Sequence, residues 1–189
     1  MPELHIITGS NGAGKSSVGP DHLPKHIRET CVVFDGDKLT IEKKRELLNK
    51  KFSRKDAQRM ADEWLGPYFL KQVENALKKS ENFAYEGHFR QEGAWSIPKK
   101  FQEKGYRIHM IFFGLVNIER SAMRVFERAC NGGHNVSAAE IELNYQGNLI
   151  QLDRHFKMFD ELKIIDSSES IPDLITHGRR TNSISSTIP

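Results

Sequence analysis

Residues 4–16 read LHIITGSNGAGKS, and this stretch decides the fold of the chain. Its first five residues, Leu4–Thr8, are rich in apolar side chains and predict a buried β-strand. The next eight, from Gly9 to Ser16, match the pattern G-x-x-x-x-G-K-[ST] at every fixed position. Glycines in such a loop let backbone N–H groups point inward at phosphate oxygens, and the helix that follows adds its positive N-terminal end. The stretch therefore predicts a strand, a triphosphate-binding loop and a helix.

The loop residues have separate expected roles. Lys15 is predicted to reach the β- and γ-phosphates, and the hydroxyl of Ser16 to ligate Mg²⁺. The alternative is a chance glycine-rich turn, but four fixed positions match in roughly one such sequence per hundred or fewer. We therefore expect ATP or GTP with Mg²⁺ to bind here. The predicted nucleotide-binding residues are Gly9, Ser10, Asn11, Gly12, Ala13, Gly14, Lys15, Ser16 and Ser17.

Beyond the loop, short apolar runs alternate with longer helical patterns. The runs are almost continuously apolar, as in a parallel sheet that is covered on both faces. They predict strands at Leu4–Thr8, Cys31–Asp35, Asn82–Glu86, Arg107–Phe113 and Leu162–Asp166. This alternation predicts an α/β fold, a three-layer sandwich with a mostly parallel five-stranded sheet, like that of nucleotide kinases and other phosphate-loop NTPases.

Four segments between the strands have helical periodicity. Gly66-Pro67 is expected to kink or divide the second of them. In the last, Ser137 and Glu140 match a capping box, and a face of Ile141, Tyr145, Leu149, Leu152, Phe156 and Phe159 is expected to be buried. Asn117 is expected to cap the third of these helices, which begins at residue 118. The segments are Lys55–Lys79, Ala94–Lys104, residues 118–130 and Ala138–Phe159.

Composition restricts the class of protein. A length of 189 residues fits one domain, and 38% hydrophobic with 28% charged residues describe an ordinary globular chain. No run approaches the roughly 20 apolar residues of a membrane helix, and no signal-peptide pattern precedes the first strand. Cys31 and Cys130 suggest reduced cysteines, so we expect a cytoplasmic protein. Residues 1–175 are predicted to form the domain, and the Ser/Thr-rich tail 176–189 to be disordered.

Charged residues close two of the predicted strands. Asp35 and Asp37 follow one strand, and Glu86, His88 and Arg90 lie at the end of another. Carboxyl ends of parallel strands face the ligand crevice, so these residues are candidates for a base, a magnesium ligand or substrate contacts. The alternatives are an Asp-Gly turn for the first pair, a structural acid for Glu86 and a polar surface residue for His88.

Three arginines, Arg120, Arg124 and Arg128, recur at four-residue spacing and share one helix face. A solvated helix face is one explanation. The other is phosphoryl transfer, because the helix runs into Asn131-Gly-Gly-His134, a hinge-like turn from which arginines close over a γ-phosphate. The patterns N-K-x-D and D-x-x-G are missing from usable places, which argues against a GTPase. A net charge of +3 suits anionic substrates but makes nucleic acid an improbable partner.

Taken in order, these segments resemble the zeta-toxin family of phosphate-loop kinases. The matching segments are GSNGAGKS at 9–16, FDGD at 34–37, YEG at 85–87, RVFERACNGGHNV at 124–136, Tyr145 and IIDSS at 164–168. The resemblance implies a small-molecule kinase whose acceptor in characterised toxins is a UDP-linked N-acetyl amino sugar. It also implies Asp37 as general base, Glu86 as an acceptor contact, and Arg128 with Arg124 on the γ-phosphate.

Two positions depart from the family pattern. Asn144 stands where many members have an arginine before the tyrosine, so a substitute such as Arg154 is expected if that arginine is a phosphate clamp. His88 stands where a small hydroxyl residue is common. The leading hypothesis is an ATP/Mg²⁺-dependent kinase of a small hydroxylated metabolite. The alternatives are a toxin defined by an antitoxin partner, a nucleotide-gated binding module without transfer activity, and a nucleic-acid end kinase.

Overall fold

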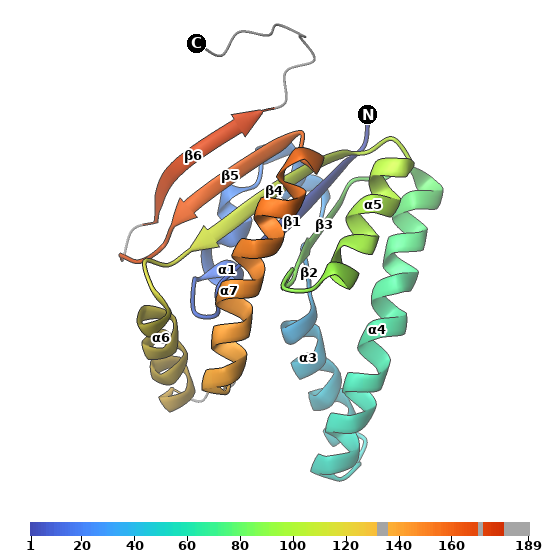
Figure 1. Cartoon of the computed structure of the whole chain (residues 1–189). Helices are drawn as coiled ribbons and strands as arrows, with labels where there is room; N and C mark the ends of the chain where they lie inside the picture. Colours follow the sequence, from blue (N-terminus) through green and yellow to red (C-terminus); the bar gives the residue numbers. More distant parts are fainter. Residues whose placement is uncertain (132–135, 170–171, 180–189) are drawn as a thin grey trace, which may run out of the picture.

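The computed structural model describes residues 1–131, 136–169 and 172–179. A twisted sheet forms the middle layer, with helices on both of its faces (Figure 1). The predicted α/β sandwich is confirmed. Within the described residues the sheet has six strands in the order β2-β3-β1-β4-β5-β6. They are β1 Glu3–Gly9, β2 Phe34–Asp35, β3 Phe83–Glu86, β4 Arg107–Gly114, β5 Glu161–Asp166 and β6 Asp173–Arg179.

The register of the central strands positions the site. Strand β1 pairs in parallel with both β3 and β4, and Ile7 lies opposite Glu86 on one side and Ile111 on the other. Parallel strands end at the same edge of a sheet, so the loop after β1 and the carboxylate that closes β3 meet there. Every described pairing is parallel except that of β6 with β5.

The predicted strand count and tail boundary were wrong. β6 pairs antiparallel with β5 and runs to Arg179, so Thr176–Arg179 belong to the sheet rather than to a disordered tail. Its Leu174 and Ile175 side chains are 51% and 64% exposed. Backbone pairing rather than side-chain burial holds this edge strand, so the sequence carries no apolar pattern for it. Residues 180–189 of the predicted tail lie outside the described residues.

Strand β2 is also shorter than the predicted Cys31–Asp35. Only Phe34 and Asp35 pair, with Tyr85 and Glu86 of β3. The apolar run 31–33 instead connects α2 to the edge of the sheet, and Val32 is 92% exposed. An apolar run therefore marked a connection here as well as a strand.

The helices form two layers around the sheet, with α1 and α2 on one face and α4, α5 and α7 on the other (Figure 1). None of the described helices is long and apolar enough to cross a membrane. The α-helices are α1 Lys15–Val18, α2 Lys25–Thr30, α3 Gly36–Asn49, α4 Arg54–Lys79, α5 Ser96–Glu103, α6 Ile118–Cys130 and α7 Ala138–His155. Short 3₁₀ helices are η1 Gly19–His22, η2 Glu92–Trp95 and η3 Phe156–Met158.

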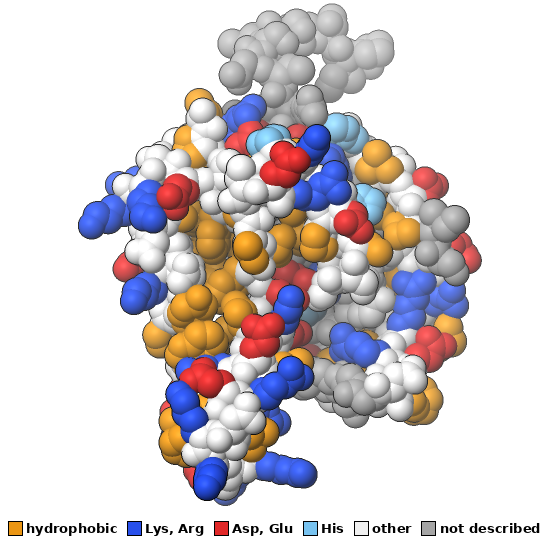
Figure 2. Space-filling model, turned by 180° about the vertical axis from the view of Figure 1, so that it is seen from behind, with side chains coloured by type: hydrophobic (Ala, Val, Ile, Leu, Met, Phe, Trp, Pro, Cys, Tyr) orange, Lys and Arg blue, Asp and Glu red, His pale blue; other side chains and the backbone are white. Residues whose placement is uncertain are grey.

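Each face of the sheet has its own apolar core. Trp95, Phe101 and Phe83 belong to the cluster on the α4–α5 side, and Ile27 and Ile111 to the one on the α1–α2 side. Helices α3 and α4 extend beyond the sheet as a hairpin, and Figure 2 shows lysine and arginine side chains gathered at its tip. The two cores hold the central strands, and with them the loop after β1, in place.

Helix α4 continues through Gly66-Pro67, so the predicted division of this helix does not occur. Proline removes one backbone donor and leaves the carbonyl oxygen of Glu63 without its helical partner. Gly66 and Pro67 are both exposed, so water can satisfy that oxygen. The cost of proline is lower on a solvent face than the sequence pattern suggests.

The predicted start of α7 is confirmed, because the Ser137 hydroxyl accepts a hydrogen bond from the backbone N–H of Glu140. Its predicted apolar face is wrong in part. Ile141 is buried, but Leu149 and Phe156 are 44% and 51% exposed. The other buried residues of the helix are Asn144, Asn148 and Gln151. The helix packs a polar face inward because that face lies against the phosphate loop.

Candidate active site

The phosphate loop requires glycine where it leaves β1. Gly9 has a φ of +137°, and a Cβ atom there would lie 2.0 Å from the carbonyl oxygen of Phe113. Gly12 has a φ of +73°, and a Cβ atom would lie 2.9 Å from the Cβ of Arg124. The first glycine lets the loop turn beside β4, and the second lets α6 pack against the loop. The loop thus carries the arginine helix directly on its outer side.

Lys15 is the buried cation of the loop. Its Nζ donates hydrogen bonds to the carbonyl oxygens of Gly9 at 3.1 Å and Ser10 at 2.9 Å. Burial lowers the pKa of Lys15 to about 8, against the opposing attraction of Glu86 and Asp37. A buried ammonium group held only by carbonyl dipoles favours an anion, which is the property that phosphate binding needs.

Ser16 and Glu86 join the loop to the end of β3. The Ser16 hydroxyl donates a hydrogen bond to Glu86 Oε2 over 2.8 Å. Burial raises the pKa of Glu86, although Lys15 and Ser16 act in the opposite direction. A hydroxyl has one proton and two lone pairs, so donation to Glu86 leaves the Ser16 oxygen free to ligate a metal ion. Glu86 therefore orients Ser16.

The two aspartates after β2 have different places. Asp35 is the N-cap of α3, and its side chain accepts a hydrogen bond from the Lys38 N–H over 3.0 Å. It does not belong to the described cavity lining, contrary to its expected role as a substrate contact. Asp37 lies in the first turn of α3 and lines the cavity. Asp35 thus has the structural role that was the alternative for this pair, and Asp37 is the one that lies at the cavity.

The three arginines of α6 also differ in what they contact. Arg120 donates to the carbonyl oxygen of Ser168 at 3.0 and 2.9 Å. Arg124 donates to the carbonyl oxygens of Ser167 and Ser168 and lies 3.5 Å from that of Gly12. Both brace the segment after β5, although Arg124 also lines the cavity, as Arg128 does. The predicted hinge-like turn that follows lies, at residues 132–134, outside the described part of the chain.

Helix α7 fastens the loop through its asparagines, which sequence patterns did not mark as functional. Asn144 donates from Nδ2 to Asn11 Oδ1 over 2.7 Å. Asn148 donates to the Gly9 carbonyl oxygen at 3.3 Å and accepts from the Phe89 N–H at 2.7 Å. The four-residue spacing of the two asparagines, beside the apolar positions of the helix, is the signal that points to this contact.

Arg90 lies beside Asn144, where a substitute for the missing arginine was expected. Its guanidinium donates to Asn144 Oδ1 over 3.0 Å and lies 3.9 Å from the Glu140 carboxylate. A Cβ atom at Gly147 would lie 2.7 Å from the Cβ of Arg90, so glycine allows this close approach. Arg154, the substitute suggested by sequence, is exposed and does not belong to the described cavity lining.

His88 projects into the same cavity. Burial in the pocket wall lowers its pKa to about 3, and the nearby charges of Lys15 and Arg90 act in the same direction. The side chain is exposed to the solvent of the cavity but lies among cations. The imidazole is therefore neutral at physiological pH and offers both a donor and an acceptor.

Most of these groups surround one cavity of about 750 Å³. That volume is typical of sites for small molecules and cofactors. Gln91 and Glu140 also line the cavity, although they were not predicted as site residues. Their position depends on how closely α7 approaches the segment after β3. The lining residues are Asn11, Gly12, Gly14, Lys15, Ser16, Ser17, Asp37, Glu86, His88, Arg90, Gln91, Gly93, Ala94, Arg124, Arg128, Val136, Glu140 and Asn144.

Solved structures share this fold. The PezAT chromosomal toxin–antitoxin system of Streptococcus pneumoniae aligns with a TM-score of 0.57 and 17% identity, covering 94% of this chain and 72% of that chain. The AvrRxo1-ORF1:-ORF2 complex with ATP aligns with a TM-score of 0.68 and 15% identity, covering 94% of this chain and 58% of that one. This chain therefore spans less than two thirds of the AvrRxo1 chain. At these identities the likeness concerns the fold alone.

A sequence comparison with curated proteins gives no match. The family model described as "Zeta toxin" matches residues 1–176, which include every strand and helix of the site. The loop, the carboxylates after β2 and β3, and the arginines of α6 all lie within that match. The chain belongs to the zeta-toxin family.

Proposed function

We propose that this chain is an ATP- and Mg²⁺-dependent kinase that phosphorylates a hydroxyl group of a small metabolite. The observation that carries the proposal is the shared cavity. A phosphate-binding loop, three carboxylates and several guanidinium groups open into the same 750 Å³ space. Phosphoryl transfer relies on positioning and on neutralising charge, and these are the groups that supply both.

The loop side of the cavity suits a nucleotide triphosphate. Lys15 now donates to two carbonyl oxygens of its own loop, and phosphate oxygens are stronger acceptors for the same ammonium protons. Gly12 and Gly14 leave the loop without side chains where phosphates would lie. Ser16 would hold Mg²⁺ through the lone pairs that Glu86 leaves free. The bound ion would neutralise charge on the phosphates.

Asp37 is the proposed general base. It projects from the first turn of α3 into the cavity, while Glu86 is engaged by Ser16 and Asp35 by the backbone of α3. The Asp37 carboxylate would accept the proton of the acceptor hydroxyl. The hydroxyl oxygen would then bond to the γ-phosphorus as ADP leaves. The second carboxylate oxygen of Glu86 would hold the acceptor.

Two arginines are proposed to stabilise the transferred phosphoryl group. Arg128 lines the cavity from α6, and Arg90 lines it from the segment after β3, held by Asn144. Arg124 is proposed as a positioning residue, because its guanidinium is already bonded to backbone carbonyl oxygens. Arg90 would thus supply the positive charge that an arginine at position 144 supplies in many family members.

The proposed acceptor is a UDP-linked N-acetyl amino sugar. Family membership supports this class, and a cavity of this size has room for acceptor groups beside the triphosphate. The neutral donor and acceptor atoms of His88, next to Arg90, suit sugar hydroxyls and the adjoining diphosphate. The replacement of a small hydroxyl side chain by imidazole is expected to narrow the range of sugars accepted.

The test is transfer of label from γ-labelled ATP, with Mg²⁺, to a panel of UDP-sugars and simple sugars. Phosphorylated product is expected with at least one member of the panel, and none with Lys15→Ala. Asp37→Asn should bind ATP with unchanged affinity but transfer at least about 100-fold more slowly. Asp37→Asn with the wild-type transfer rate would overturn the assignment of the base. Tight ATP binding without transfer to any acceptor would favour a nucleotide-gated binding module.

We further infer an antitoxin partner that covers the cavity. The likeness to the PezAT toxin–antitoxin structure supports such a partner. Phe126 and Met123 are 68% and 43% exposed on α6, the helix that carries the cavity arginines. Expression of the chain alone should slow growth, and Lys15→Ala should remove the effect. Normal growth on expression of active enzyme would contradict this part of the proposal.

A further inference from the structure

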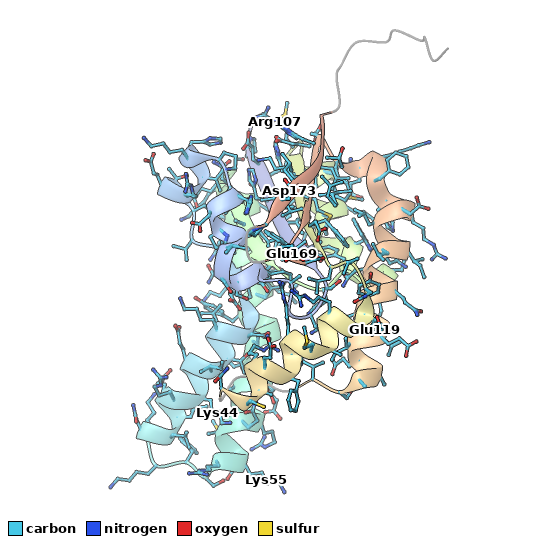
Figure 3. All side chains as sticks on the ribbon, turned by 90° about the vertical axis from the view of Figure 1, so that its left-hand side faces the viewer. Lys44, Lys55, Arg107, Glu119, Glu169 and Asp173 are labelled. Atoms are coloured by element: carbon cyan, nitrogen blue, oxygen red, sulfur yellow. The ribbon has the colours of Figure 1, made fainter. Side chains whose placement is uncertain are left out.

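Polar side chains cross the central strands at the end of the sheet away from the phosphate loop. His5 lies opposite His109, and His109 opposite Glu161, while Glu3 lies two residues before His5. Opposed residues of parallel strands point to the same face of the sheet. These four residues are only 2–8% exposed. Arg107, the residue opposite Glu3, marks this end of the sheet in Figure 3, well away from Glu119 of α6.

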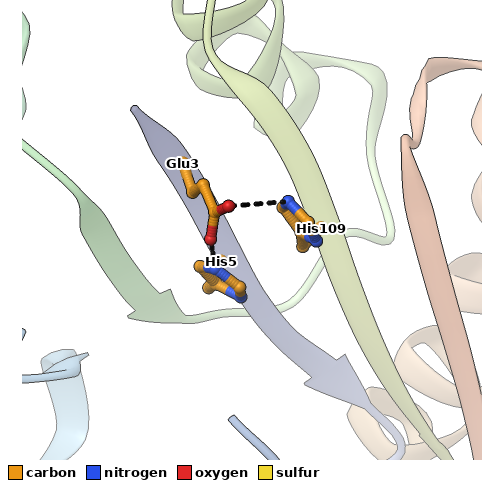
Figure 4. Close-up of side chains that lie close together, drawn as sticks. All are labelled: Glu3, His5 and His109. Atoms are coloured by element: carbon orange, nitrogen blue, oxygen red, sulfur yellow. Dashed lines mark hydrogen bonds and ion pairs between the residues drawn. The ribbon is translucent and has the colours of Figure 1, made fainter. Parts of the chain in front are cut away.

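Hydrogen bonds satisfy most of this cluster. Glu3 Oε2 lies 3.0 Å from His5 Nε2 and 3.1 Å from Nε2 of His26 on α2. Glu161 Oε2 lies 3.1 Å from His109 Nδ1. One buried atom remains, because His109 Nε2 makes no hydrogen bond among the described residues. It faces Glu3 Oε1 over 3.9 Å, which is too long for a hydrogen bond (Figure 4).

The tautomer of His109 explains why this atom is significant. Glu161 accepts only from a protonated Nδ1, so Nε2 of the neutral ring carries a lone pair. A lone pair and a carboxylate oxygen, both acceptors, therefore face each other inside the protein. Arg107 pairs with Glu3 Oε1, but the lone pair of His109 Nε2 has no donor among the described residues, and this costs free energy unless a cation reaches it.

A metal ion fits this gap. Zn²⁺ reaches imidazole nitrogen and carboxylate oxygen over about 2.0–2.2 Å each, so it can bridge atoms about 4 Å apart. A histidine ligand whose other ring nitrogen donates to a carboxylate is the usual arrangement at such sites, and Glu161 supplies that carboxylate. One ligand atom each from Glu3, His5 and His109 lies within 4.8 Å of the others.

His5 must turn to complete the site. Its ring is stacked on that of His109, with centroids 4.5 Å apart and planes at 15°, and parallel rings cannot both point at one ion. Glu161 fixes the His109 ring, so we expect the His5 ring to rotate. The ring borders a small cavity of about 10 Å³ that His109 and Glu161 also line.

We propose that Glu3, His5 and His109 bind a divalent transition-metal ion, with Zn²⁺ as the natural occupant. Two imidazoles and one carboxylate suit Zn²⁺ better than Mg²⁺, which prefers oxygen ligands and is assigned to Ser16. The ion would tie β1 to β4 at the end of the sheet opposite the cavity, so its role is structural. His26 of α2 lies 3.1 Å from Glu3 Oε2 and is not one of the three proposed ligands.

Arg107 provides the sharpest test, since its guanidinium forms an ion pair with Glu3 Oε1 and competes with the ion. Its side chain is 49% exposed and can move into solvent. Arg107→Gln should therefore tighten Zn²⁺ binding about tenfold or more, whereas His109→Gln should weaken it by at least about 100-fold. Glu161→Gln should weaken it about 10- to 100-fold, because the orienting carboxylate is lost.

The experiment is calorimetric titration of ZnCl₂ into chelator-treated, tag-free protein without nucleotide, in a Cys130→Ser background that removes the exposed thiol. One site is expected, with a higher Tm when Zn²⁺ is bound. His155→Gln is the matched control, because His155 bonds Glu92 away from the cluster, and its affinity should equal that of the background. If His109→Gln does not fold, Arg107→Gln still decides the outcome.

Three results would overturn the site: no Zn²⁺ binding by the background protein, unchanged affinity in His109→Gln, or affinity in Arg107→Gln that is unchanged or weaker. Any of them would leave the cluster as a network of hydrogen bonds that fastens β1 to its neighbours. The proposed kinase activity does not depend on this site, so neither result bears on the other.

Discussion

The side-chain amide of Asn144 donates a hydrogen bond to the side-chain oxygen of Asn11 over 2.7 Å, which fastens helix α7 to the phosphate loop. The same Asn144 accepts a hydrogen bond from Arg90 through its oxygen. One buried amide thus couples the loop to the guanidinium of Arg90, which also lines the cavity. Asn144, which departs from the family pattern, therefore links the proposed nucleotide site to the proposed phosphoryl site.

Arg90→Ala is expected to lower kcat by about 100-fold or more, because a charge-stabilising arginine is lost from phosphoryl transfer. ATP affinity should change little, since the loop is intact. Steady-state kinetics with saturating ATP measure both quantities. Arg154→Ala is the control and should keep wild-type kcat, because Arg154 is exposed outside the described cavity lining. The reverse pattern would return the role to Arg154.

Asn144→Ala is expected to destabilise the protein by about 1–3 kcal/mol, because the buried Asn11 oxygen loses its partner. The kcat should also fall, as Arg90 loses its support. Chemical denaturation and kinetics on the same preparation separate the two effects. Wild-type kcat in this variant would show that Asn144 does not position Arg90.

Two helix-interior glycines offer a matched pair. Gly147→Ala in α7 is expected to cost about 1–3 kcal/mol, because its Cβ would lie 2.7 Å from the Cβ and 3.0 Å from the carbonyl oxygen of Arg90. Gly66→Ala in α4 meets no atom of another element within 4 Å and should change stability by less than about 1 kcal/mol, because the gain in helix propensity is opposed by the contact of its Cβ with the ring of Pro67. Urea denaturation measures both. Equal stability of the two variants would contradict the close approach of α7 to Arg90.

The neighbouring aspartates separate structure from chemistry. Asp37→Asn is expected to lower kcat by at least about 100-fold with little change in stability. Asp35→Asn should keep both kcat and stability near wild type, because asparagine caps a helix about as well as aspartate. Kinetics with the identified acceptor and thermal unfolding measure the two variants. Loss of kcat in Asp35→Asn but not in Asp37→Asn would show that Asp35, and not Asp37, is the general base.

Lys15 predicts how nucleotide binding depends on pH. Its pKa of about 8 in the free protein should rise when phosphates approach, because they favour the charged ammonium. Binding should therefore take up a proton above pH 8, and affinity should fall as pH rises further. Calorimetry at about pH 8.5 in two buffers of different ionisation enthalpy should show uptake of more than about half a proton. Lys15→Arg should show no such uptake, since arginine stays charged.

The sequence predicted those parts of the site that depend on local patterns. Glycine spacing identified the loop, and Ser137 and Asn117 cap their helices as predicted. The meeting of Ser16 with Glu86 follows from a general rule, because parallel strands end at one edge of the sheet. A local motif and a topological rule were sufficient to place both residues at one edge of the sheet, but the hydrogen bond between them was not predicted.

Other features depend on tertiary packing, for which the sequence carries little or no local signal. Whether Asp35 or Asp37 faces the cavity is decided by where α3 begins, one residue after β2. The contact of the α7 asparagines with the loop was not predicted, because the sequence does not say that the partner of the helix is a polar loop. The histidine and glutamate cluster arises from the register of three strands that are distant in the sequence.

The most direct test of the central claim compares ADP formation with phosphorylated acceptor in the same reaction. With Mg²⁺, ATP and the UDP-sugar found in the screen, the kinase account predicts equal amounts of ADP and phosphorylated sugar. It also predicts that Asp37→Asn binds ATP normally but forms neither product at more than about one hundredth of the wild-type rate. ATP bound by the loop without acceptor-dependent ADP, across the whole panel, would contradict phosphoryl transfer.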